Sequence, residues 1–432
     1  MITINTSDKG WDEKVSVLLD RMSALPENVD RAVREIIELV KARGDSALFE
    51  YTRIFDKFDP EKNGLCFGTQ EMKKAYEESP KDILEALSCA AERIEAFHSH
   101  QKEQSWFITD ESGTILGQKV SPVDSAGIYV PGGLNAFPST MLMNVIPAKI
   151  AGVENIVVVS PTPSGRASQT LLAAAHVAGV DRIFRVGGAQ AIAALAYGTK
   201  SIPRVNKVVG PGNIYVAHAK RLLQGVIGID AFAGPSEILV IADSGADPRV
   251  VACDLLSQAE HDAQACSIFI TPCKDLAGKV LHEVEKAVTA LPRRETVRES
   301  LDSHGACIVT RDMDEAIDIA NRVAPEHLEL MLENAWEYLG RIRNAGAVFL
   351  GYMTPEAMGD YMAGPNHTLP TGSTARFYSP LGVYDFTKRT SVVGISRKTM
   401  DELGPMAVRI ARTEDLEAHA QSVECRLDKP GS

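Results

Sequence analysis

Apolar residues recur at spacings of three and four in the first hundred residues, which is the period of a helix that buries one face. One such stripe covers residues 27–42 and stops before Arg43-Gly44, a typical helix end. A second stripe covers residues 80–101, and the short apolar run 64–68 between them predicts a strand. The N-terminal segment is therefore predicted to be mainly helical.

From about residue 115 the pattern changes to short β-branched runs that alternate with alanine-rich helical stretches. Strands are predicted in two series, the first at 126–130, 155–160, 182–186 and 207–209 and the second at 238–242, 267–271, 306–310 and 347–350. Helices are predicted between them, for example at 169–178, 189–197 and 250–259. Strands that alternate with helices indicate βαβ units and parallel sheets.

Two series of similar length predict an α/β protein with two parallel-sheet lobes. We place the boundary near Ala233-Gly234-Pro235-Ser236, so that 121–235 form one lobe and 1–120 with 236–375 form the other. The last predicted helix, 415–426, has only a weak apolar stripe. Residues 376–432 are therefore predicted to be a C-terminal arm that packs on something else, not a third domain.

Composition narrows the class of protein. The 432 residues are 45% hydrophobic and 24% charged, which excludes a disordered chain, and the net charge is −12. A nucleic-acid partner is not expected, because phosphate contacts need clustered Lys and Arg. With no apolar run of 18 residues and no apolar leader, we expect no membrane span and a cytoplasmic protein. Seven scattered cysteines without a CxxC pair predict reduced thiols.

Three predicted strands of the first series end in glycine-rich loops, Pro131-Gly132-Gly133, Gly187-Gly188-Ala189-Gln190 and Gly210-Pro211-Gly212-Asn213. Ligands of open parallel sheets bind outside the carboxyl ends of strands, and glycine lets the backbone approach them closely. A tight turn explains any one loop equally well, but three in one lobe favour a nucleotide or cofactor cleft. No G-x-G-x-x-G or P-loop motif occurs, so a dinucleotide would bind without the standard phosphate fingerprint.

Gln258 and His261 project from one face of a predicted helix end, with Asp254 on the same side. A carboxamide and an imidazole can bind a metal, although a polar helix end is the simpler interpretation of this segment alone. Asp360 and His367 lie in a long polar loop that follows the buried-looking strand 347–350, a typical position for a site.

Glu326 and His327 are neighbours in the sequence, so their side chains diverge and cannot easily share one ligand. They can serve two steps of one reaction, since His can remove a hydroxyl proton and Glu can activate a water. A solvated turn explains the pair equally well.

These residues leave three function classes open. The first is a zinc-dependent NAD dehydrogenase. The second is a metallohydrolase with the same metal ligands and Glu326 as base, which gives the glycine-rich loops no role. The third is a non-catalytic α/β binding protein, which is disfavoured because so many ionisable groups lie in loops at strand ends.

Several strings occur in one order over most of the chain: GIYVPGG, GGAQAIAALAYGT, GPGN, AGPSE, DLLSQAEHD, APEHLEL, GDYMAGPNHTLPT and LEAHA. In these motifs the chain resembles the L-histidinol dehydrogenase family of histidine biosynthesis, from about residue 30 to 427. The resemblance implies two Rossmann-like lobes of aldehyde-dehydrogenase-like fold. It also implies a homodimer whose active sites are shared between subunits, with the C-terminal arm as the dimerisation element.

The resemblance assigns roles to the residues that match the family's motifs. It implies one Zn²⁺ per subunit, held by Gln258, His261, Asp360 and, from the partner subunit, His419. It implies that Glu326 and His327 are catalytic. The implied substrate-binding residues are Ser236, Gln258, His261, His327, Asp360, His367, Glu414 and His419, and the implied NAD⁺ contacts are Tyr129, Gln190 and Asn213.

The implied reaction is the last step of histidine biosynthesis, the four-electron oxidation of L-histidinol to L-histidine through L-histidinaldehyde, with two NAD⁺ reduced. The alternative is a paralogous enzyme that oxidises another small amino or sulfonated alcohol. A thiohemiacetal route would need a nucleophilic thiol near the site. The nearest cysteines, Cys253 and Cys266, are both predicted to be buried spacers, which favours attack by water on the aldehyde.

Overall fold

A computed structural model describes residues 1–19, 27–132, 137–231 and 234–427. Gly133 and Ala233, named above in predicted loops, lie outside these ranges. The chain forms two compact units, one from Met1–Gln101 with Asp124–Phe386 and one from Lys102–Val123 with Thr387–Ser432. None of the described helices is long and apolar enough to cross a membrane.

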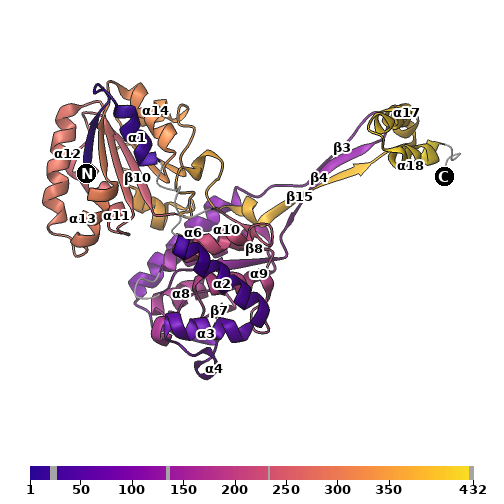
Figure 1. Ribbon diagram of the computed structural model, residues 1–432, viewed down its shortest axis with the longest axis horizontal. Coiled ribbons are helices and arrows are strands. Elements are labelled where there is room, and N and C mark those ends of the chain that lie inside the picture. The colour runs from indigo at the N-terminus through magenta and orange to yellow at the C-terminus, as the bar shows by residue number, and fades with distance from the viewer. Residues whose placement is uncertain (20–26, 133–136, 232–233, 428–432) are drawn as a thin grey trace. The chain divides into compact units, whose positions relative to one another are not determined.

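The first unit contains a six-stranded sheet of order β2-β7-β6-β5-β8-β9 (Figure 1). All its neighbouring strands are parallel except β2, which is antiparallel to β7. The strands are β2 (Cys66–Gly68), β5 (Ser125–Tyr129), β6 (Asn155–Val159), β7 (Arg182–Phe184), β8 (Lys207–Val209) and β9 (Gly228–Ile229). The predicted strands of the first series therefore form one sheet.

Helices bury this sheet, which explains why its strands are apolar runs without polar alternation. One apolar core joins the strands to α2 (Glu27–Arg43), α3 (Asp45–Asp56), α9 (Gly188–Tyr197) and α10 (Ile214–Leu223). Four further helices pack on one another, α5 (Thr69–Glu77), α6 (Lys81–Ser99), α7 (Pro138–Ala151) and α8 (Gln169–Val177), and α7 also contacts β5. The short helix α4 (Pro60–Asn63) follows α3.

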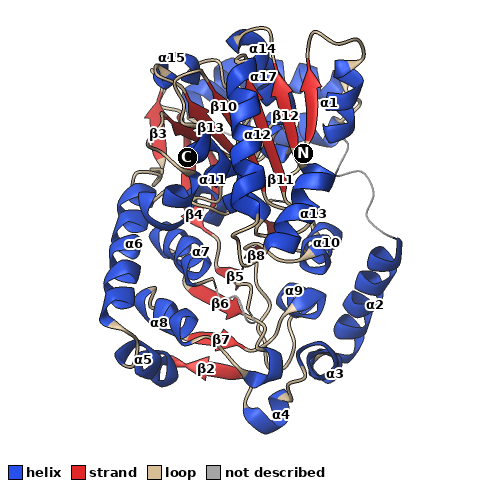
Figure 2. Cartoon of the chain, turned by 90° about the vertical axis from the view of Figure 1, so that its left-hand side faces the viewer, coloured by secondary structure: helices blue, strands red, loops and turns tan. Residues whose placement is uncertain are grey.

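The second six-stranded sheet of this unit has the order β1-β12-β11-β10-β13-β14 and is parallel throughout (Figure 2). Its strands are β1 (Ile2–Asn5), β10 (Glu237–Ala242), β11 (Cys266–Thr271), β12 (Ala306–Val309), β13 (His327–Met331) and β14 (Ala347–Leu350). One face packs on α11 (Pro248–Ala259), α12 (Lys274–Val288) and α13 (Arg294–His304), and the other on α1 (Trp11–Leu19), α14 (Met313–Val323) and α15 (Ala335–Leu339).

The two sheets share one strand order. In each, the chain adds two strands on one side of its first long strand and then crosses to the other side for the next two. This reversal lies between β5 and β8 in one sheet and between β10 and β13 in the other. The two predicted α/β lobes of parallel sheet are thus confirmed, while the exact domain limits given above stay a prediction.

After β14 the chain forms short helical segments, namely α16 (Glu356–Met358), the π-helix η3 (Gly359–Ala363), and the 3₁₀ turns η4 (Thr374–Arg376) and η5 (Val383–Phe386). Another 3₁₀ turn, η2 (Pro163–Gly165), follows β6. The predicted polar loop is therefore partly helical.

The second unit is a three-stranded antiparallel sheet of order β15-β4-β3 that leads to two helices (Figure 1). These elements are β3 (Trp106–Thr109), β4 (Ile115–Pro122), β15 (Thr387–Gly394), α17 (Arg397–Thr413) and α18 (Glu417–Leu427). The predicted C-terminal helix is α18, and it packs on α17 where Gly404 leaves room for Val423 and Leu427. The strands of this unit were not anticipated from the sequence.

Many large apolar side chains of the second unit are exposed. They are Trp106, Phe107, Ile108, Ile115, Leu116, Val393, Ile395, Leu403, Met406, Ile410 and Leu416. Many exposed large apolar side chains on a small unit are typical of an interface with another molecule.

The buried carboxylate of Glu315 links the start of the chain to α14. Its Oε2 accepts hydrogen bonds from the Thr6 hydroxyl at 2.6 Å and from the Arg311 backbone N–H at 2.8 Å, and the Arg311 side chain binds Oε1 at 2.7 Å. Burial acts to raise the pKa of Glu315, but these donors outweigh it and lower the pKa to about 2.

We expect Glu315→Gln to destabilise the protein at neutral pH. The folded-state pKa lies below the ordinary value of 4.5, so the ionised carboxylate stabilises the fold above pH 4.5 and loses that effect as pH falls toward 2. Urea midpoints of wild type and variant should therefore differ at pH 7 and converge in acid. A difference that stays constant down to pH 2 would contradict the assigned ion pair.

Candidate active site

Glu326 and His327 lie where β13 begins and are both buried, with 7% and 3% of their surface exposed. The interpretation as a solvated turn is therefore wrong. The backbone of Glu237, the first residue of β10, holds both side chains, because its N–H donates to Glu326 Oε2 at 2.8 Å and its carbonyl lies 2.9 Å from His327 Nδ1. Since a carbonyl can only accept, Nδ1 carries the proton and Nε2 is left as a proton acceptor.

This pair lies at the amino edge of its sheet, since His327 pairs with Ile238 near the start of β10 and with Ala347 at the start of β14. The sequence expectation that sites follow the carboxyl ends of strands does not hold here. The reason is that α11 runs back from the end of β10 and delivers its own C-terminus to the amino edge. Residues near helix ends, not strand ends, therefore meet Glu326 and His327.

The electrostatics of the pair are coupled. Burial raises the pKa of Glu326, and the nearby His327 opposes that rise. Burial alone would lower the pKa of His327, but the carboxylates of Glu326 and Asp360 outweigh burial and raise it. His327 Nδ1 lies 3.6 Å from Glu326 Oε2, and Nε2 lies 3.6 Å from Asp360 Oδ1. An imidazole held between two carboxylates is a stronger base than a free one.

Asp360 lies in η3 and interacts electrostatically with three histidines, His327, His367 and His261. Burial acts to raise the pKa of Asp360, but the three nearby imidazoles outweigh burial and lower the pKa below its ordinary value. The structure thus brings together four of the predicted site residues from α11, β13 and the loop after β14. Such a cluster of imidazoles and a carboxylate suits a divalent metal.

Gln258 is in the last turn of α11 and is 99% buried, while His261 follows the helix and is exposed. Gln258 Oε1 has no hydrogen-bond donor within the described residues. A buried carbonyl oxygen without a donor is costly unless another positive group binds it. This orphaned oxygen, one turn from His261, fits a metal ligand.

Glu356 is a site residue that the sequence reasoning missed. It begins α16, is 97% buried, and offers a carboxylate oxygen that lies within 4.8 Å of ligand atoms of His327 and Asp360. These three groups can hold a cation together. The only signal in the sequence was that Glu356 lies in the predicted polar loop. That signal could not single it out, because other polar residues of the loop share it and burial is not visible in the sequence.

His367 is oriented through both ring nitrogens. Nδ1 lies 2.9 Å from the carbonyl of Asp360, and Nε2 lies 3.1 Å from the hydroxyl of Thr140 in α7. Burial lowers the pKa of His367, which favours the neutral ring. Ser236 is half-buried just before β10, and its carbonyl accepts from the Cys266 N–H at 2.9 Å. Ser236 directly precedes Glu237, whose backbone contacts Glu326 and His327. His367 contacts Asp360, which lies beside His327.

The predicted NAD⁺ contacts lie at the carboxyl edge of the other sheet. Tyr129 ends β5, and its buried hydroxyl accepts from the Gly188 N–H at 3.2 Å, so it contacts the N-terminus of α9. Gln190 is buried in the first turn of α9, and its Oε1 lacks a donor within the described chain. Asn213 caps α10 by accepting from the N–H groups of Tyr215 and Val216.

These residues come together for a topological reason. β5 and β8 are neighbours at the point where the strand order reverses, the usual place for a nucleotide in such sheets. Gly210, directly after β8, has φ +110°, and a Cβ there would lie 2.1 Å from the Tyr129 carbonyl, so only glycine fits. The three predicted NAD⁺ contacts therefore lie at one edge of this sheet, and their role in binding a cofactor stays a prediction.

Glu414 and His419 belong to the second unit, where both are exposed, Glu414 after α17 and His419 on α18. Their predicted part in the metal and substrate sites stays a prediction. Of the two cysteines, Cys266 is buried at the start of β11 as predicted, whereas Cys253 is exposed on α11, so its predicted burial is wrong. The apolar period of α11 places Cys253 on its outer face.

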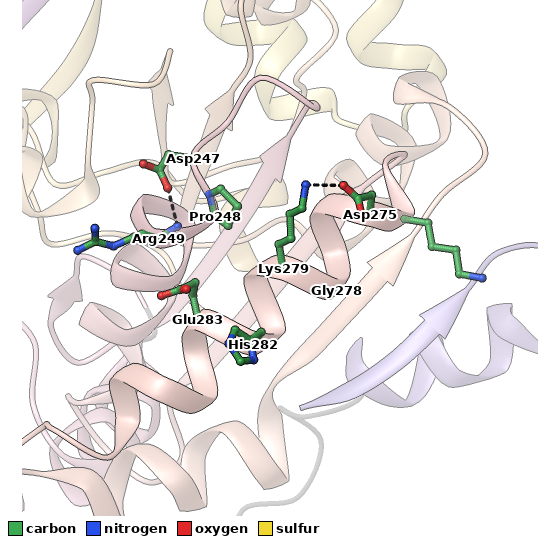
Figure 3. Close-up of a pocket in the computed structure, with 9 residues that line it drawn as sticks. Asp247, Pro248, Arg249, Asp275, Gly278, Lys279, His282 and Glu283 are labelled. Carbon is green, nitrogen blue, oxygen red and sulfur yellow. Dashed lines mark hydrogen bonds and ion pairs between the residues drawn. The ribbon is translucent and has the colours of Figure 1, made fainter.

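A surface pocket elsewhere is not this site. It lies at the N-terminal end of α11 beside α12 and is lined by Asp247, Pro248, Arg249, Lys274, Asp275, Gly278, Lys279, His282 and Glu283 (Figure 3). Gln258 is ten residues further along α11, or about 15 Å at 1.5 Å per residue. The pocket therefore contributes no group to the cluster around His327 and Asp360.

Comparisons with known proteins extend over the whole chain. The histidinol dehydrogenase family model matches residues 19–427. Histidinol dehydrogenase of Sulfurimonas denitrificans is 50% identical over 99% of this chain and 100% of its own, and that of Syntrophotalea carbinolica is 49% identical over 99% of each. A crystal structure of histidinol dehydrogenase from Elizabethkingia anophelis is similar with a TM-score of 0.92 and 36% identity, and the match covers 99% of this chain and 98% of that chain.

A buried ion pair holds the loop after β8. Lys220 of α10 is 98% buried and pairs with Asp230, and together they bind both sides of Gly210. The Gly210 N–H donates to Asp230 Oδ2 at 2.7 Å, and its carbonyl accepts from Lys220 Nζ at 3.0 Å. The pair therefore fixes the backbone of one of the predicted cofactor loops.

We expect Lys220→Met to lower the free energy of unfolding by about 3–5 kcal/mol, because it leaves the Asp230 carboxylate buried without its partner. The matched control is Lys279→Met, which breaks the exposed Lys279–Asp275 pair seen in Figure 3 and should leave stability unchanged. Chemical denaturation measures both variants. If both variants lost the same free energy of unfolding, the Lys220–Asp230 pair would not stabilise the Gly210 loop more than an exposed ion pair does.

Proposed function

The chain belongs to the histidinol dehydrogenase family, and we propose that it oxidises L-histidinol to L-histidine through L-histidinaldehyde, the last step of histidine biosynthesis. Two NAD⁺ accept the two hydrides. The observation that carries the proposal is the buried Glu326–His327 pair beside Asp360, which supplies a general base for each oxidation.

We propose that the metal is Zn²⁺, one per subunit, bound by Gln258, His261, Asp360 and the partner's His419. Gln258 Oε1, buried without a donor, supports this set. Bound there, Zn²⁺ would hold the imidazole and amine of the substrate and so orient the carbon that loses hydride. Ser236, His367 and Glu414 are proposed to contact the substrate as well.

In the first oxidation His327 removes the hydroxyl proton of the alcohol. Its Nδ1–H is committed to the Glu237 carbonyl, so Nε2 is the atom that takes the proton, and the nearby Asp360 carboxylate stabilises the imidazolium that forms. Because the Glu237 carbonyl fixes the tautomer, Nε2 remains the basic nitrogen of the ring.

In the second oxidation Glu326 draws a proton from the water that attacks the aldehyde, and His327 deprotonates the resulting hydrate. Burial raises the pKa of Glu326, so its carboxylate holds a proton more firmly than an ordinary glutamate. This route needs no thiol nucleophile.

NAD⁺ is proposed to bind at the reversal point between β5 and β8, with Tyr129, Gln190 and Asn213 as contacts. The buried Gln190 oxygen without a donor and the close backbone approach at Gly210 support this place. The N-termini of α9 and α10 also point to this edge, where backbone N–H groups favour the pyrophosphate.

We propose that the active form is a homodimer in the cytoplasm, in which the exposed apolar side chains of the second unit are covered by the partner. Burial of such residues in a partner interface removes an otherwise unfavourable contact with water. The seven free cysteines support a reducing compartment.

We expect the enzyme to form two NADH for each L-histidinol consumed with NAD⁺. The absorbance at 340 nm measures the NADH that is formed. Treatment with a chelator should abolish the reaction, and added Zn²⁺ should restore it. One NADH per substrate, or a preference for an alcohol without an imidazole, would point instead to a paralogous dehydrogenase.

Because Glu326 is proposed to act only in the second oxidation, Glu326→Gln should affect the two oxidations unequally. Oxidation of L-histidinaldehyde should fall by about 10²–10⁴-fold, because the amide cannot take a proton from water, while alcohol oxidation is largely spared. Single-turnover NADH formation from each substrate separates the steps. The matched variant His327→Gln should impair both; equal losses in Glu326→Gln would refute the division of roles.

A further inference from the structure

Helix α7 contacts both halves of the proposed site, yet the mechanism gives it no role. It contacts β5, which ends at the predicted NAD⁺ contact Tyr129, and it contacts η5, which lies in the segment after β14. Every residue from Thr140 to Ala148 is buried, which is typical of a helix that is covered on all sides. The helix therefore lies inside the first unit, not on its surface.

Two polar side chains interrupt the apolar surface of α7. Thr140 and Asn144 are 2% and 0% exposed and lie four residues apart, so they share one face of the helix. That face meets the loop after β14, because the Thr140 hydroxyl lies 3.1 Å from His367 Nε2 and the Thr368 hydroxyl donates to Asn144 Oδ1 at 3.4 Å. Since buried polar groups need partners, these contacts favour one position of the loop.

A proline inside α7 provides a third contact with the loop. Pro147 has no N–H, so the Met143 carbonyl, four residues earlier, lacks its usual α-helical donor. The side chain of Asn366 replaces that donor, because its Nδ2 donates to the Met143 carbonyl at 2.5 Å. Asn366 Oδ1 in turn accepts the N–H of Thr368 at 2.8 Å. Three consecutive loop residues, 366–368, are therefore bound to α7.

His367 is the central residue of this contact and is held at both ring nitrogens. Its Nδ1 lies 2.9 Å from the carbonyl of Asp360, and its Nε2 is the atom beside Thr140. A hydroxyl can donate to that nitrogen or accept from it, so the contact does not depend on where the ring proton lies. Thr140 therefore sets the orientation of the imidazole from the opposite side to Asp360.

We propose that α7 positions the loop 366–368, with Thr140 as the positioning residue that orients His367. The inference rests on the proposed function for the roles of His367 and NAD⁺. The β5 sheet carries the proposed cofactor contacts and the loop after β14 carries His367, so a helix that contacts both helps to fix substrate against cofactor. Hydride transfer requires that the two reacting atoms be held close together in one orientation.

The test compares Thr140→Val with Thr140→Ser in the full-length enzyme. Valine has nearly the shape of threonine but no hydroxyl, so it leaves His367 Nε2 without this partner, whereas serine keeps the hydroxyl. We expect kcat/KM for L-histidinol to fall about 10-fold in the Val variant and to stay within about 2-fold of wild type in the Ser variant, as for one lost or retained hydrogen bond. The KM for NAD⁺ should be unchanged in both variants.

Hydrogen–deuterium exchange of the enzyme without substrate gives a readout that needs no turnover. The N–H of Thr368 is hydrogen-bonded within the loop, so peptides over 361–371 should exchange faster in Thr140→Val than in wild type or Thr140→Ser. Thr52→Val is the matched control, because Thr52 is a fully buried threonine of α3 whose hydroxyl donates to the Leu48 carbonyl at 2.8 Å. It should change neither the exchange of 361–371 nor kcat/KM.

Should Thr140→Val fail to fold, Thr368→Val tests the same contact from the loop, because it removes the hydroxyl that donates to Asn144 Oδ1. A fall in kcat/KM for L-histidinol with an unchanged KM for NAD⁺ is again expected. An unchanged kcat/KM in Thr368→Val would contradict the positioning role of α7.

Three results would overturn the inference. If Thr140→Val kept the wild-type kcat/KM or the wild-type exchange over 361–371, Thr140 would not orient His367. If Thr140→Ser were impaired as much as Thr140→Val, the hydroxyl would not be the group that matters. If the KM for NAD⁺ rose by the same factor as the KM for L-histidinol, the effect would be a general loss of structure. Absence of NADH formation by wild type on L-histidinol would refute the proposed function instead, while exchange over 361–371 would still decide whether Thr140 holds the loop.

Discussion

The backbone of Glu237 at the amino edge of the second sheet makes the two contacts on which the candidate active site depends. Its N–H holds the Glu326 carboxylate and its carbonyl holds the His327 imidazole, so one peptide position fixes both bases. Burial makes that fixation necessary, because an ionisable group removed from water must have defined partners. Burial raises the pKa of Glu326 and so makes it a stronger base, whereas the pKa of His327 is raised by the carboxylates of Glu326 and Asp360, which outweigh the opposing effect of burial.

The remaining polar groups of the site follow from where α11 and the segment after β14 return to this edge. α11 brings Gln258 and Asp254, and η3 brings Asp360 among three histidines. Glu329, on β13, accepts the backbone N–H of Glu356 at the start of α16. Buried polar networks of this kind tolerate loss of a member poorly, since each deletion leaves another group unpaired.

The β5 sheet and the β10 sheet have the same strand order but present different chemical groups. In the β5 sheet the reversal point presents glycine-rich loops and two helix N-termini at the carboxyl edge, which suits an anionic cofactor. In the β10 sheet the same reversal presents carboxylates and imidazoles at the amino edge, which suits proton transfer and a cation. The Lys220–Asp230 pair fixes the Gly210 loop of the first arrangement, and the backbone of Glu237 fixes the side chains of the second.

The sequence by itself determined the elements that local pattern controls. The strands of the two six-stranded sheets other than β1, β9 and β13, and the helices α2, α6, α8, α9, α11 and α18, follow from the local apolar pattern, and the motifs identified the family. Only the tertiary structure decided that Glu326 and His327 are buried at the amino edge, that Cys253 faces outward, and that Glu356 joins the cluster. Burial and proximity depend on contacts between residues far apart in the chain, such as Glu237 with Glu326 or Ser257 with Glu356, and the local sequence pattern does not encode these contacts.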